Sequence, residues 1–161
     1  TLCAAWADRY ELIRLDSRVV PGDPDLILAD LAMWDESWTA LFDEADTVVH
    51  LAAQADDPGA TWDDLMPSNL DALANVLLAA AQAGVDRVVF ASSRRAADGA
   101  DPLDVSKRIG ERLGRCFATA TGLSFVAVRV GPDTGDDLVR LFTAAVESEP
   151  GEGAFLTLPG A

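Results

Sequence analysis

The chain has 161 residues, enough for one domain with a buried core and too few for two. Half of the residues (50%) are apolar, which excludes a disordered chain, and the longest apolar run is too short to span a bilayer. Lys and Arg number 12 against 27 Asp and Glu, for a formal net charge of −15. Because such a surface repels phosphate backbones and anionic lipid, we expect no nucleic-acid or membrane partner.

Two cysteines and a single histidine restrict the chemistry of the chain. Cys3 and Cys116 indicate neither a disulfide framework nor a zinc site, so we expect a reducing, cytoplasmic environment. His50 alone builds neither a histidine metal cluster nor a Ser-His-Asp triad, and we expect it to be a hydrogen-bonded histidine within a strand. The chain opens at Thr1 in what resembles the middle of a helix, without the pattern of a signal peptide.

Apolar periodicity and turn residues predict alternating helices and strands along the whole chain. The predicted helices cover residues 2–9, 36–45, 69–83, 102–121 and 137–146. The predicted strands cover residues 10–15, 26–29, 47–51, 87–91, 124–130 and 154–158. A loop is expected over residues 52–64, and Gly84 and Gly122 are expected to end two of the helices.

The strand sequences predict the fold class. The runs VVHL, VVF and FVAV are continuously apolar, which suits a parallel sheet covered on both faces. Strands that alternate with helices imply crossover connections. We therefore predict an α/β fold with a doubly wound parallel sheet of the Rossmann kind, as a single domain over residues 1–161.

Ligands of open parallel sheets bind beyond the carboxyl ends of the strands, so residues at these ends are candidates for a nucleotide site. Asp16 can accept hydrogen bonds from adenosine ribose hydroxyls, although a solvated turn aspartate fits the same pattern. Asp30 can bond an adenine amino group while Leu31 packs on the ring, with a helix cap as the alternative. Arg18 could instead bind a phosphate, so NAD is expected and NADP is not excluded.

The second half of the candidate site follows the next strands. Leu51, Ala52 and Ala53 would let a flat cofactor lie against the backbone. Ser93 can bond a substrate oxygen, or be only a strand-end turn residue. Lys107 can hold the hydroxyls of a nicotinamide ribose, or be only a surface lysine.

Taken together, these segments resemble the extended short-chain dehydrogenase/reductases of the NAD-dependent epimerase/dehydratase family. The resemblance covers nearly the whole chain and rests on ELIRLD, ILADL, ADTVVHLAAQ, SNLDALANVLLAAAQAG, VDRVVFASS, VSKRIGERLGR and GLSFVAVRVGP. Within the family, Trp62 followed by Asn69 and the FASS strand end are more similar to the uronate-dehydrogenase branch than to the nucleotide-sugar epimerases. The resemblance implies oxidation or epimerisation of a hydroxyl on a sugar or sugar acid, through a transient ketone.

The resemblance also implies roles for individual residues. Ser93 matches the serine that polarises the substrate oxygen, and Lys107 matches the lysine that binds ribose and lowers the pKa of a tyrosine phenol. That tyrosine stands four residues before the lysine, on the same helix face, and here the position is Leu103. Acid–base assistance contributes about 10²–10⁴-fold, so we expect weak or no turnover.

Other departures from the family pattern concern the start of the chain and its loops. The opening strand and its glycine-rich turn are absent from the sequence, and the stretch from Ser93 to Lys107 is shorter than the usual active-site loop. Without that central strand, either residues 10–15 pair directly with residues 47–51 or a gap exposes unpaired backbone groups. The chain is therefore expected to be a fragment or a degenerate family member.

Two other function classes remain open. The first is a non-catalytic nucleotide-binding or partner module that keeps the fold without the chemistry. The second is a flavodoxin-like receiver or flavin domain, which would need an acidic or phosphate-binding cluster at the first strand that the sequence does not show. The family resemblance implies a small-molecule substrate as a partner, and a homodimer formed through the helices over residues 69–83 and 103–121.

Overall fold

The computed structural model describes residues 1–54, 59–132, 134–135 and 137–148, and the backbone of residues 155–159. The helices are α1 Leu2–Trp6, α2 Glu36–Thr39, α3 Trp62–Leu65, α4 Ala72–Ala83, α5 Pro102–Thr121 and α6 Asp137–Glu147. Three short helical segments of other kinds are η1 Ala40–Glu44, η2 Met66–Asp71 and η3 Arg94–Ala96. The strands are β1 Leu15–Asp16, β2 Ile27–Leu28, β3 Thr47–His50, β4 Arg87–Ser93, β5 Ser124–Val130 and β6 Phe155–Pro159.

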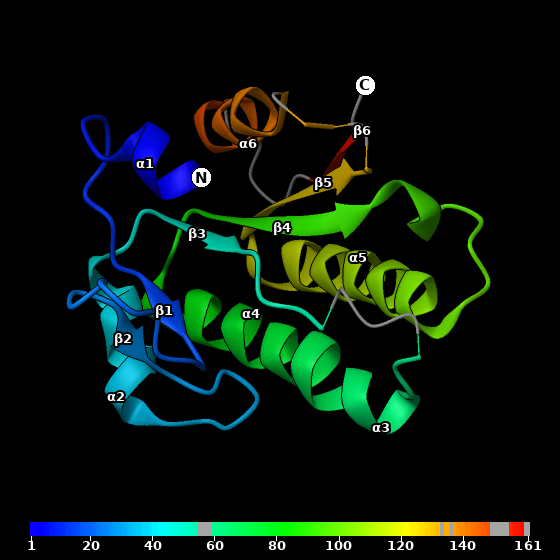
Figure 1. Cartoon of the computed structure of the whole chain (residues 1–161), viewed down its shortest axis with the longest axis horizontal. Helices are drawn as coiled ribbons and strands as arrows, with labels where there is room; N and C mark the ends of the chain where they lie inside the picture. The colour runs from blue at the N-terminus through cyan, green and yellow to red at the C-terminus, as the bar shows by residue number, and fades with distance from the viewer. Residues whose placement is uncertain (55–58, 133, 136, 149–154, 160–161) are drawn as a thin grey trace.

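A four-stranded parallel sheet in the order β3-β4-β5-β6 forms the centre of the molecule (Figure 1). The helices α4 and α5 cover one face of this sheet, and α1 and α6 cover the other. Parallel strands buried on both faces by helices confirm the predicted α/β, doubly wound, Rossmann-like fold.

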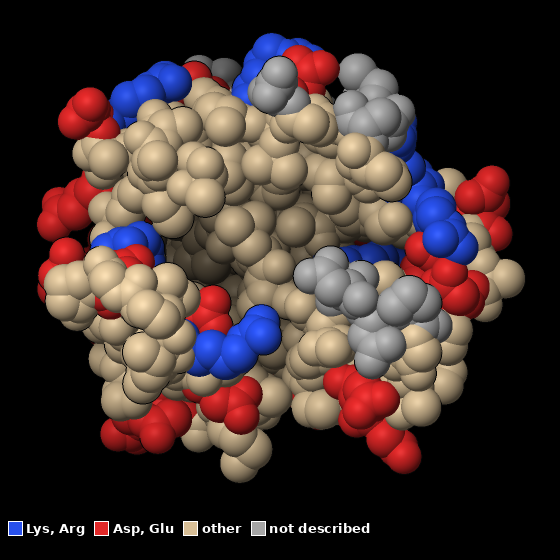
Figure 2. All heavy atoms as spheres, in the orientation of Figure 1, with Lys and Arg blue, Asp and Glu red and all other residues tan. Residues whose placement is uncertain are grey.

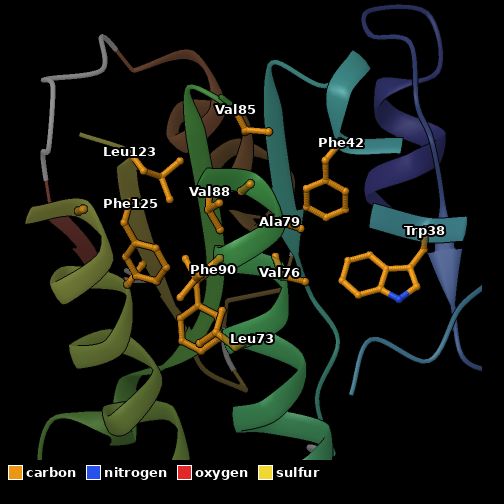
Figure 3. Packing of buried hydrophobic residues seen from close by; sticks show 14 of the residues in the cluster. Trp38, Phe42, Leu73, Val76, Ala79, Val85, Val88, Phe90, Leu123 and Phe125 are labelled. Carbon is orange, nitrogen blue, oxygen red and sulfur yellow. The ribbon is translucent and has the colours of Figure 1, made fainter. Parts of the chain in front are cut away.

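Successive side chains of the central strands enter two separate cores. In β4, Val88 and Phe90 face the α4–α5 side, whereas Val89 faces the α6 side. This alternation is the period of two that a strand imposes on its side chains. Figure 3 shows the α4–α5 core, in which the rings of Phe90 and Phe125 lie beside α5.

Helix α5 approaches the sheet closely because two glycines face the aromatic rings. A Cβ at Gly114 would overlap the ring of Phe125, and a Cβ at Gly110 would lie 2.8 Å from the ring of Phe90. The helix begins with Pro102 after the N-cap Asp101 and ends at Gly122, whose φ of 81° is left-handed. These caps explain why the predicted bounds of this helix are confirmed.

The first two strands form a separate two-stranded sheet, in which β1 pairs only with β2. Of the two alternatives that the missing strand left open, the described residues show the gap, because β1 and β3 are not hydrogen-bonded to each other. Figure 2, in the orientation of Figure 1, shows a hollow in the surface over the space between β1 and β3. The facing edges of β1 and β3 therefore remain without a neighbouring strand in the described part of the chain.

Several predicted element bounds were wrong. The strand over residues 10–15 is reduced to Leu15–Asp16, because only these two residues pair in register with β2, and Tyr10 and Leu12 pack instead against the α1–α6 core. The strand over residues 26–29 is likewise reduced to Ile27–Leu28. The predicted loop over residues 52–64 contains the start of α3, which Thr61 and Asp64 cap reciprocally.

Other bounds were shifted rather than lost. The helix over residues 36–45 changes from α2 to the 3₁₀ segment η1, and the helix over residues 69–83 begins as the π-helical segment η2. The predicted strand over residues 87–91 extends through Ser92 and Ser93, because both residues pair in register with β5. The last strand is shifted to Phe155–Pro159, and residue 154 lies outside the described residues.

Candidate cofactor and substrate site

Lys107 is the most deeply buried of the charged candidates. It lies on α5 and is 7% exposed. Its Nζ donates a hydrogen bond of 2.8 Å to the carbonyl of Ala91 in β4 and lies 5.0 Å from the ring centroid of Phe90. Burial lowers the pKa of Lys107 to about 8. The interpretation of Lys107 as an ordinary surface lysine was therefore wrong.

Ser93 lies two residues beyond Ala91 in the same strand, so α5 brings Lys107 against the end of β4 that carries Ser93. The Ser93 hydroxyl accepts a 3.2 Å hydrogen bond from the backbone N–H of Arg95, which caps η3. A hydroxyl that accepts one hydrogen bond still has its own proton to donate. The Ser93 side chain thus combines the strand-end turn role with the capacity to bond a substrate oxygen.

The neighbouring Ser92 has a structural role. It is 2% exposed, and its hydroxyl donates a 2.6 Å hydrogen bond to Glu111 of α5. Glu111 in turn receives two hydrogen bonds, of 2.8 and 2.6 Å, from the guanidinium of Arg129 in β5. This buried network fixes α5 against the ends of β4 and β5, and it raises the pKa of Arg129 through the Glu111 hydrogen bond.

Asn69 joins three segments of the candidate site. Its Oδ1 accepts a 2.7 Å hydrogen bond from the backbone N–H of Gln54, and its Nδ2 donates one of 3.0 Å to the Ser106 hydroxyl. Asn69 is 3% exposed, and Ser106 directly precedes Lys107. The segment that follows β3 is thereby tied to η2 and α5. Sequence reasoning used Asn69 only as part of the family resemblance and missed this role.

His50 ends β3 beside Lys107. It is 3% exposed, it stacks on Phe90 at a centroid distance of 6.1 Å, and its Nε2 has no hydrogen-bond partner among the described residues. Burial, and to a smaller degree the charge of Lys107, lowers the pKa of His50 to about 3. The expectation of a fully hydrogen-bonded strand histidine was therefore wrong at Nε2, and the ring stays neutral.

Leu51, Ala52 and Ala53 follow His50 directly. Leu51 and Ala52 are exposed and Ala53 is half-buried, so these residues line the surface just beyond the end of β3. Because β3 and β4 are parallel neighbours, their carboxyl ends lie at the same edge of the sheet. The Leu51–Ala53 segment and Ser93 therefore share that edge, as the sequence predicts.

The adenosine candidates belong to the other, two-stranded sheet. Asp16 is half-buried at the end of β1, and its Oδ1 accepts a 2.9 Å hydrogen bond from the backbone N–H of Arg18. Asp30 is exposed and accepts a 3.0 Å hydrogen bond from the N–H of Ala32. Both aspartates thus make the local turn contacts that were the structural alternative, and their ligand role stays a prediction.

Leu31 packs inward from the same segment. Its side chain is half-buried against the α4–α5 core, and its carbonyl accepts a 2.9 Å hydrogen bond from Asn75 of α4. Asn75 also donates to the carbonyl of Ala32 at 3.1 Å. These contacts fix the turn after β2 to α4, and the stacking of Leu31 on an adenine ring stays a prediction.

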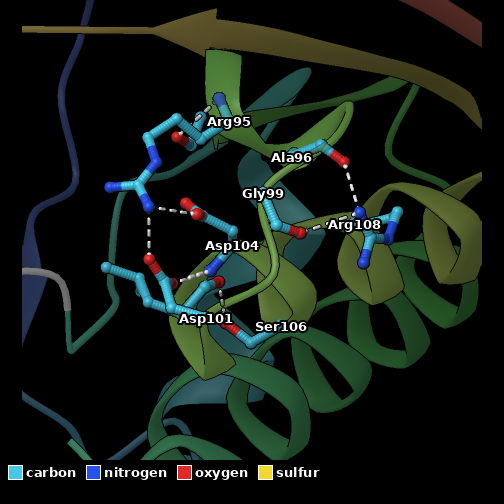
Figure 4. A network of polar contacts seen from close by, with 9 residues as sticks. Arg95, Ala96, Gly99, Asp101, Asp104, Ser106 and Arg108 are labelled. Carbon is cyan, nitrogen blue, oxygen red and sulfur yellow. Dashed lines mark hydrogen bonds and ion pairs between the residues drawn. The ribbon is translucent and has the colours of Figure 1, made fainter.

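Leu103 occupies the position four residues before Lys107, on the first turn of α5. Its carbonyl accepts a 2.7 Å hydrogen bond from the Ser106 hydroxyl, and its half-buried side chain has no group that can donate a proton. The acidic side chains nearest in sequence are those of Asp101, the N-cap of α5, and Asp104 in its first turn, and Figure 4 shows both beside Arg95.

The Asp104 side chain packs against the loop that joins η3 to α5. Arg95 Nη2 lies 2.9 Å from Asp104 Oδ2 and 2.5 Å from Asp101 Oδ2, and a Cβ at Gly99 would overlap the Asp104 carboxyl group. Burial, with the hydrogen bond to Asp101, raises the pKa of Asp104, whereas the hydrogen bond from the Asp104 backbone lowers the pKa of Asp101. The two carboxyl groups thus stabilise the loop and face Arg95.

The described residues offer neither a metal centre nor a membrane-spanning helix. No group of three or more His, Cys, Asp or Glu side chains in the described part of the chain is arranged to hold a metal ion. No helix among the described residues combines the length and the apolar character needed to cross a bilayer.

Among curated proteins, the L-arabinose 1-dehydrogenase (NAD(P)(+)) of Haloferax volcanii is 34% identical over 124 residues, covering 60% of this chain and 48% of the relative. An NAD-dependent glucose-6-phosphate dehydrogenase of the same organism is 29% identical over 116 residues, covering 55% of this chain and 44% of the relative. The chain therefore spans about half the length of the curated relatives it matches.

Among solved structures, the uronate dehydrogenase of Agrobacterium tumefaciens has a TM-score of 0.79 at 25% identity, covering 97% of this chain and 69% of that one. A UDP-galactose 4-epimerase has a TM-score of 0.79 at 26% identity, covering 98% and 71%. The model of the NAD dependent epimerase/dehydratase family matches residues 1–137. With that match over most of the chain and a parallel doubly wound fold in common, the chain belongs to the NAD dependent epimerase/dehydratase family.

Proposed function

We propose that this chain is the nucleotide-binding part of an NAD(P)-dependent oxidoreductase or epimerase that acts on a sugar or sugar acid, with turnover impaired at Leu103. The observation that carries the proposal is the buried Lys107, held against the end of β4 that bears Ser93. The relatives support the substrate class, because they are dehydrogenases of arabinose, glucose 6-phosphate and uronate. A uronate dehydrogenase related to this chain has been solved with NAD.

Lys107 and Ser93 suit the nicotinamide side of the dinucleotide and the substrate oxygen beside it. An ammonium group has three N–H donors, and one of those of Lys107 is used by Ala91, so two remain for ribose hydroxyls. Ser93 retains its hydroxyl proton for a substrate oxygen. When bound, the nicotinamide ring would supply hydride transfer. Lys107 would orient the ribose, and Ser93 would polarise the carbon–oxygen bond that reacts.

The proton transfer is the step that this chain lacks. Leu103 stands where a phenol would exchange its proton with the substrate, and a leucine side chain has no such proton. The raised pKa of Asp104 alone does not make it a substitute, because its carboxyl group faces Gly99 and Arg95 inside the loop. We therefore propose that Ser93 and Lys107 act on a bound ligand without efficient acid–base assistance.

The adenosine side of the site is less complete. We propose that Asp16, Asp30 and Leu31 bind the adenosine and that Leu51, Ala52 and Ala53 lie against the cofactor, with NAD preferred over NADP. The half-buried carboxylate of Asp16 supports NAD, because a 2′-phosphate beside it would be repelled. The gap between β1 and β3 lies between these two sets of residues, and we expect it to weaken dinucleotide binding.

A non-catalytic nucleotide-binding or partner module is the second candidate. It is favoured by Leu103, since that substitution removes proton transfer while Lys107, Ser93 and the fold are kept. The two candidates predict the same affinity for NAD and different consequences when a phenol is restored.

Replacing Leu103 with Tyr tests the proposal. If Ser93 and Lys107 are correctly placed, L103Y should raise NAD-dependent oxidation of a sugar acid by about 10²-fold or more, because acid–base assistance is restored. L103F is the matched control, since it adds the same ring without the hydroxyl, and its turnover should stay at the level of the parent chain. Initial rates at saturating NAD, across a panel of aldoses and uronates, measure both variants.

The binding of NAD is measured separately, by titration with tryptophan fluorescence or calorimetry. Saturable binding with no gain of turnover in L103Y would support the non-catalytic module. Absence of NAD binding to the parent chain and to both variants would overturn the nucleotide site altogether. K107M should weaken NAD binding by about tenfold or more if Lys107 donates to the ribose, since hydrogen bonds from charged groups are worth about 1.5–3 kcal/mol.

The oligomeric state and the compartment are also proposals. Leu78 on α4 and Ile109 on α5 are 41% and 39% exposed, which suits a homodimer formed by these two helices. If the homodimer forms, sedimentation should show a dimer for the parent chain and a monomer for L78E. A monomer in both cases would contradict the dimer. Cys3 and Cys116 are exposed free thiols, which fits our proposal of a reducing cytoplasm.

A further inference from the structure

A cavity of about 220 Å³ lies between η3, α5 and β5. Four of its lining residues are arginines, and Glu111 is the one acidic residue of the lining: the arginines are Arg108, Arg112, Arg115 and Arg129. The chain as a whole has 12 Lys and Arg against 27 Asp and Glu. A third of its basic residues therefore gather at one cavity of a strongly acidic protein.

The acidic residue of the lining is already neutralised. The Glu111 carboxylate accepts two hydrogen bonds from Arg129, of 2.8 and 2.6 Å, and a third from Ser92 at 2.6 Å. Glu111 is 6% exposed, so it belongs to the floor of the cavity. Because its oxygens are occupied by these donors, the carboxylate has little capacity to pair with the other arginines.

Arg108 brings a charge that no carboxylate contacts among the described residues. Its Nη1 donates to the carbonyls of Ala96 and Gly99, at 3.4 and 3.2 Å, as Figure 4 shows. Carbonyl oxygens fix the position of the guanidinium, and the nearby carboxylate of Asp104 compensates its charge only in part. The direct ion pair of Asp104, in the first turn of α5, is with Arg95, at 2.9 Å.

Arg112 follows Arg108 by one helical turn of α5. It is exposed, and in the described part of the chain its side chain has no hydrogen bond or ion pair. Residues four apart on a helix project from the same side, so Arg108 and Arg112 reach the cavity together. The cavity thus combines a guanidinium group held in place by backbone carbonyls with one that has its donors available.

We propose that this cavity binds a small anion that carries a phosphoryl group. A guanidinium group presents donors in a planar fork that matches phosphate oxygens, and a dianion gains from more than one such fork. A monocarboxylate has one charge and two oxygens, so it compensates two guanidinium groups less fully than a phosphoryl dianion does. Asp16, Ser93 and Lys107 are not among the residues that line this cavity, so the cavity is separate from the proposed nucleotide site.

The proposal is tested by titrating the chain with inorganic phosphate and with pyrophosphate at low ionic strength. Backbone and arginine side-chain resonances report the binding, and we expect saturable shifts at Ala96, Ala97, Arg108 and Arg112. R112Q should weaken binding by about tenfold, as expected for the loss of a charge-assisted hydrogen bond. R112Q is not expected to unfold, because Arg112 is exposed and makes no described contact.

A matched control separates a specific site from general charge. R140Q also removes one exposed arginine, but Arg140 lies on α6 and pairs with Asp137 at 3.0 Å. We expect R140Q to bind phosphate as the parent chain does. Equal weakening by R112Q and R140Q, or shifts that do not saturate, would overturn the site.

Two further titrations test which anion chemistry the cavity prefers and whether it binds independently of NAD. Acetate at the same concentrations should leave the lining resonances in place, and acetate binding as tight as that of phosphate would overturn the phosphoryl assignment. NAD should not displace phosphate from Ala96 and Ala97. Competition between the two would show that both use one site and would overturn the separate cavity, whatever the outcome for NAD binding itself.

Discussion

The two sheets of the molecule differ in how much of their surface is covered. The four-stranded sheet has β4 and β5 at its centre, with residues such as Val88 and Phe125 that are 0% exposed. In the two-stranded sheet, Ile27 and Leu28 of β2 are 37% and 57% exposed. The strands of the covered sheet are up to seven residues long, whereas β1 and β2 have two residues each.

The difference shows that a strand needs neighbours and cover, and not only a suitable sequence. Backbone groups of β4 are paired on both sides, by β3 and β5, and helices α5 and α6 pack on its two faces. β1 has one neighbour, and its other edge borders the gap toward β3. Local opening costs least where few apolar groups are buried, so the β1–β2 half should be the less stable part.

The same division separates the two halves of the candidate site. The half with Ser93 and Lys107 belongs to the covered sheet, where buried hydrogen bonds through Asn69 and Glu111 fix the positions of β3, β4 and α5. The half with Asp16 and Asp30 belongs to the small sheet and is held by local turn contacts. Preorganisation is therefore greater on the side that would hold the reacting groups.

The largest expected effect comes from truncating a ring in the covered sheet. F125A should lower the free energy of unfolding by about 3–5 kcal/mol, because Phe125 is fully buried beside Gly114 and its removal leaves a cavity. L28A in β2 is the matched control, with an expected loss below about 0.5 kcal/mol because Leu28 is exposed. Urea denaturation of both variants measures the difference, and equal losses would contradict a stability difference between the sheets.

A second, smaller effect concerns acid. Burial, with the charge of Lys107, lowers the pKa of His50 from 6.5 to about 3. Between these values the unfolded chain binds a proton that the folded chain does not, so stability is full above pH 6.5 and falls as the pH drops toward 3. H50F should remove this loss of unfolding free energy, which is ~3 kcal/mol at pH 4.

The acid experiment compares the pH dependence of the variants rather than their absolute stability. Unfolding of the parent chain, H50F and the exposed control L78F is followed at several pH values from 8 to about 4. Carboxylates contribute equally to all three chains, so L78F should parallel the parent curve while H50F is flatter. A curve for H50F that parallels the parent chain would show that His50 is not held neutral.

The covered sheet is also the part that the sequence predicts best. The bounds of α5 and β5 were predicted to the residue, because local features mark them: Asp101 and Pro102 begin the helix, Gly122 ends it, and SFVAVRV is continuously apolar. The strand over residues 10–15 was wrong because its existence depends on a neighbour that the described structure does not supply. Local pattern predicts an element well only where tertiary pairing agrees with it.

The candidate site divides in a similar way. Position and spacing in the sequence were sufficient to predict that Ser93 and Lys107 lie near each other, at the end of β4 and the start of α5, and their roles stay predictions. The contacts of Asn69 were missed because its partners, Gln54 and Ser106, lie 15 and 37 residues away in the sequence. Hydrogen bonds over such separations depend on the packing of η2 against α5, which no local pattern encodes.

The smallest expected effect probes the two-stranded sheet directly. Arg14, just before β1, forms an ion pair with Asp23, and the two side chains are 28% and 23% exposed. R14Q should lower the global free energy of unfolding by less than about 1 kcal/mol, as is usual for solvent-accessible ion pairs. R140Q on α6, whose pair with Asp137 is more exposed, is the control and should change even less.

Hydrogen exchange locates the effect of R14Q within the molecule. The N–H groups of Ile27 and Ala29 donate to the carbonyls of Arg14 and Asp16, so they report the pairing of β1 with β2. We expect these two amides to exchange faster in R14Q while amides of β4 and β5 keep their protection, because the small sheet opens on its own. If all amides lost protection together, the two sheets would unfold as one cooperative unit and the comparison would fail.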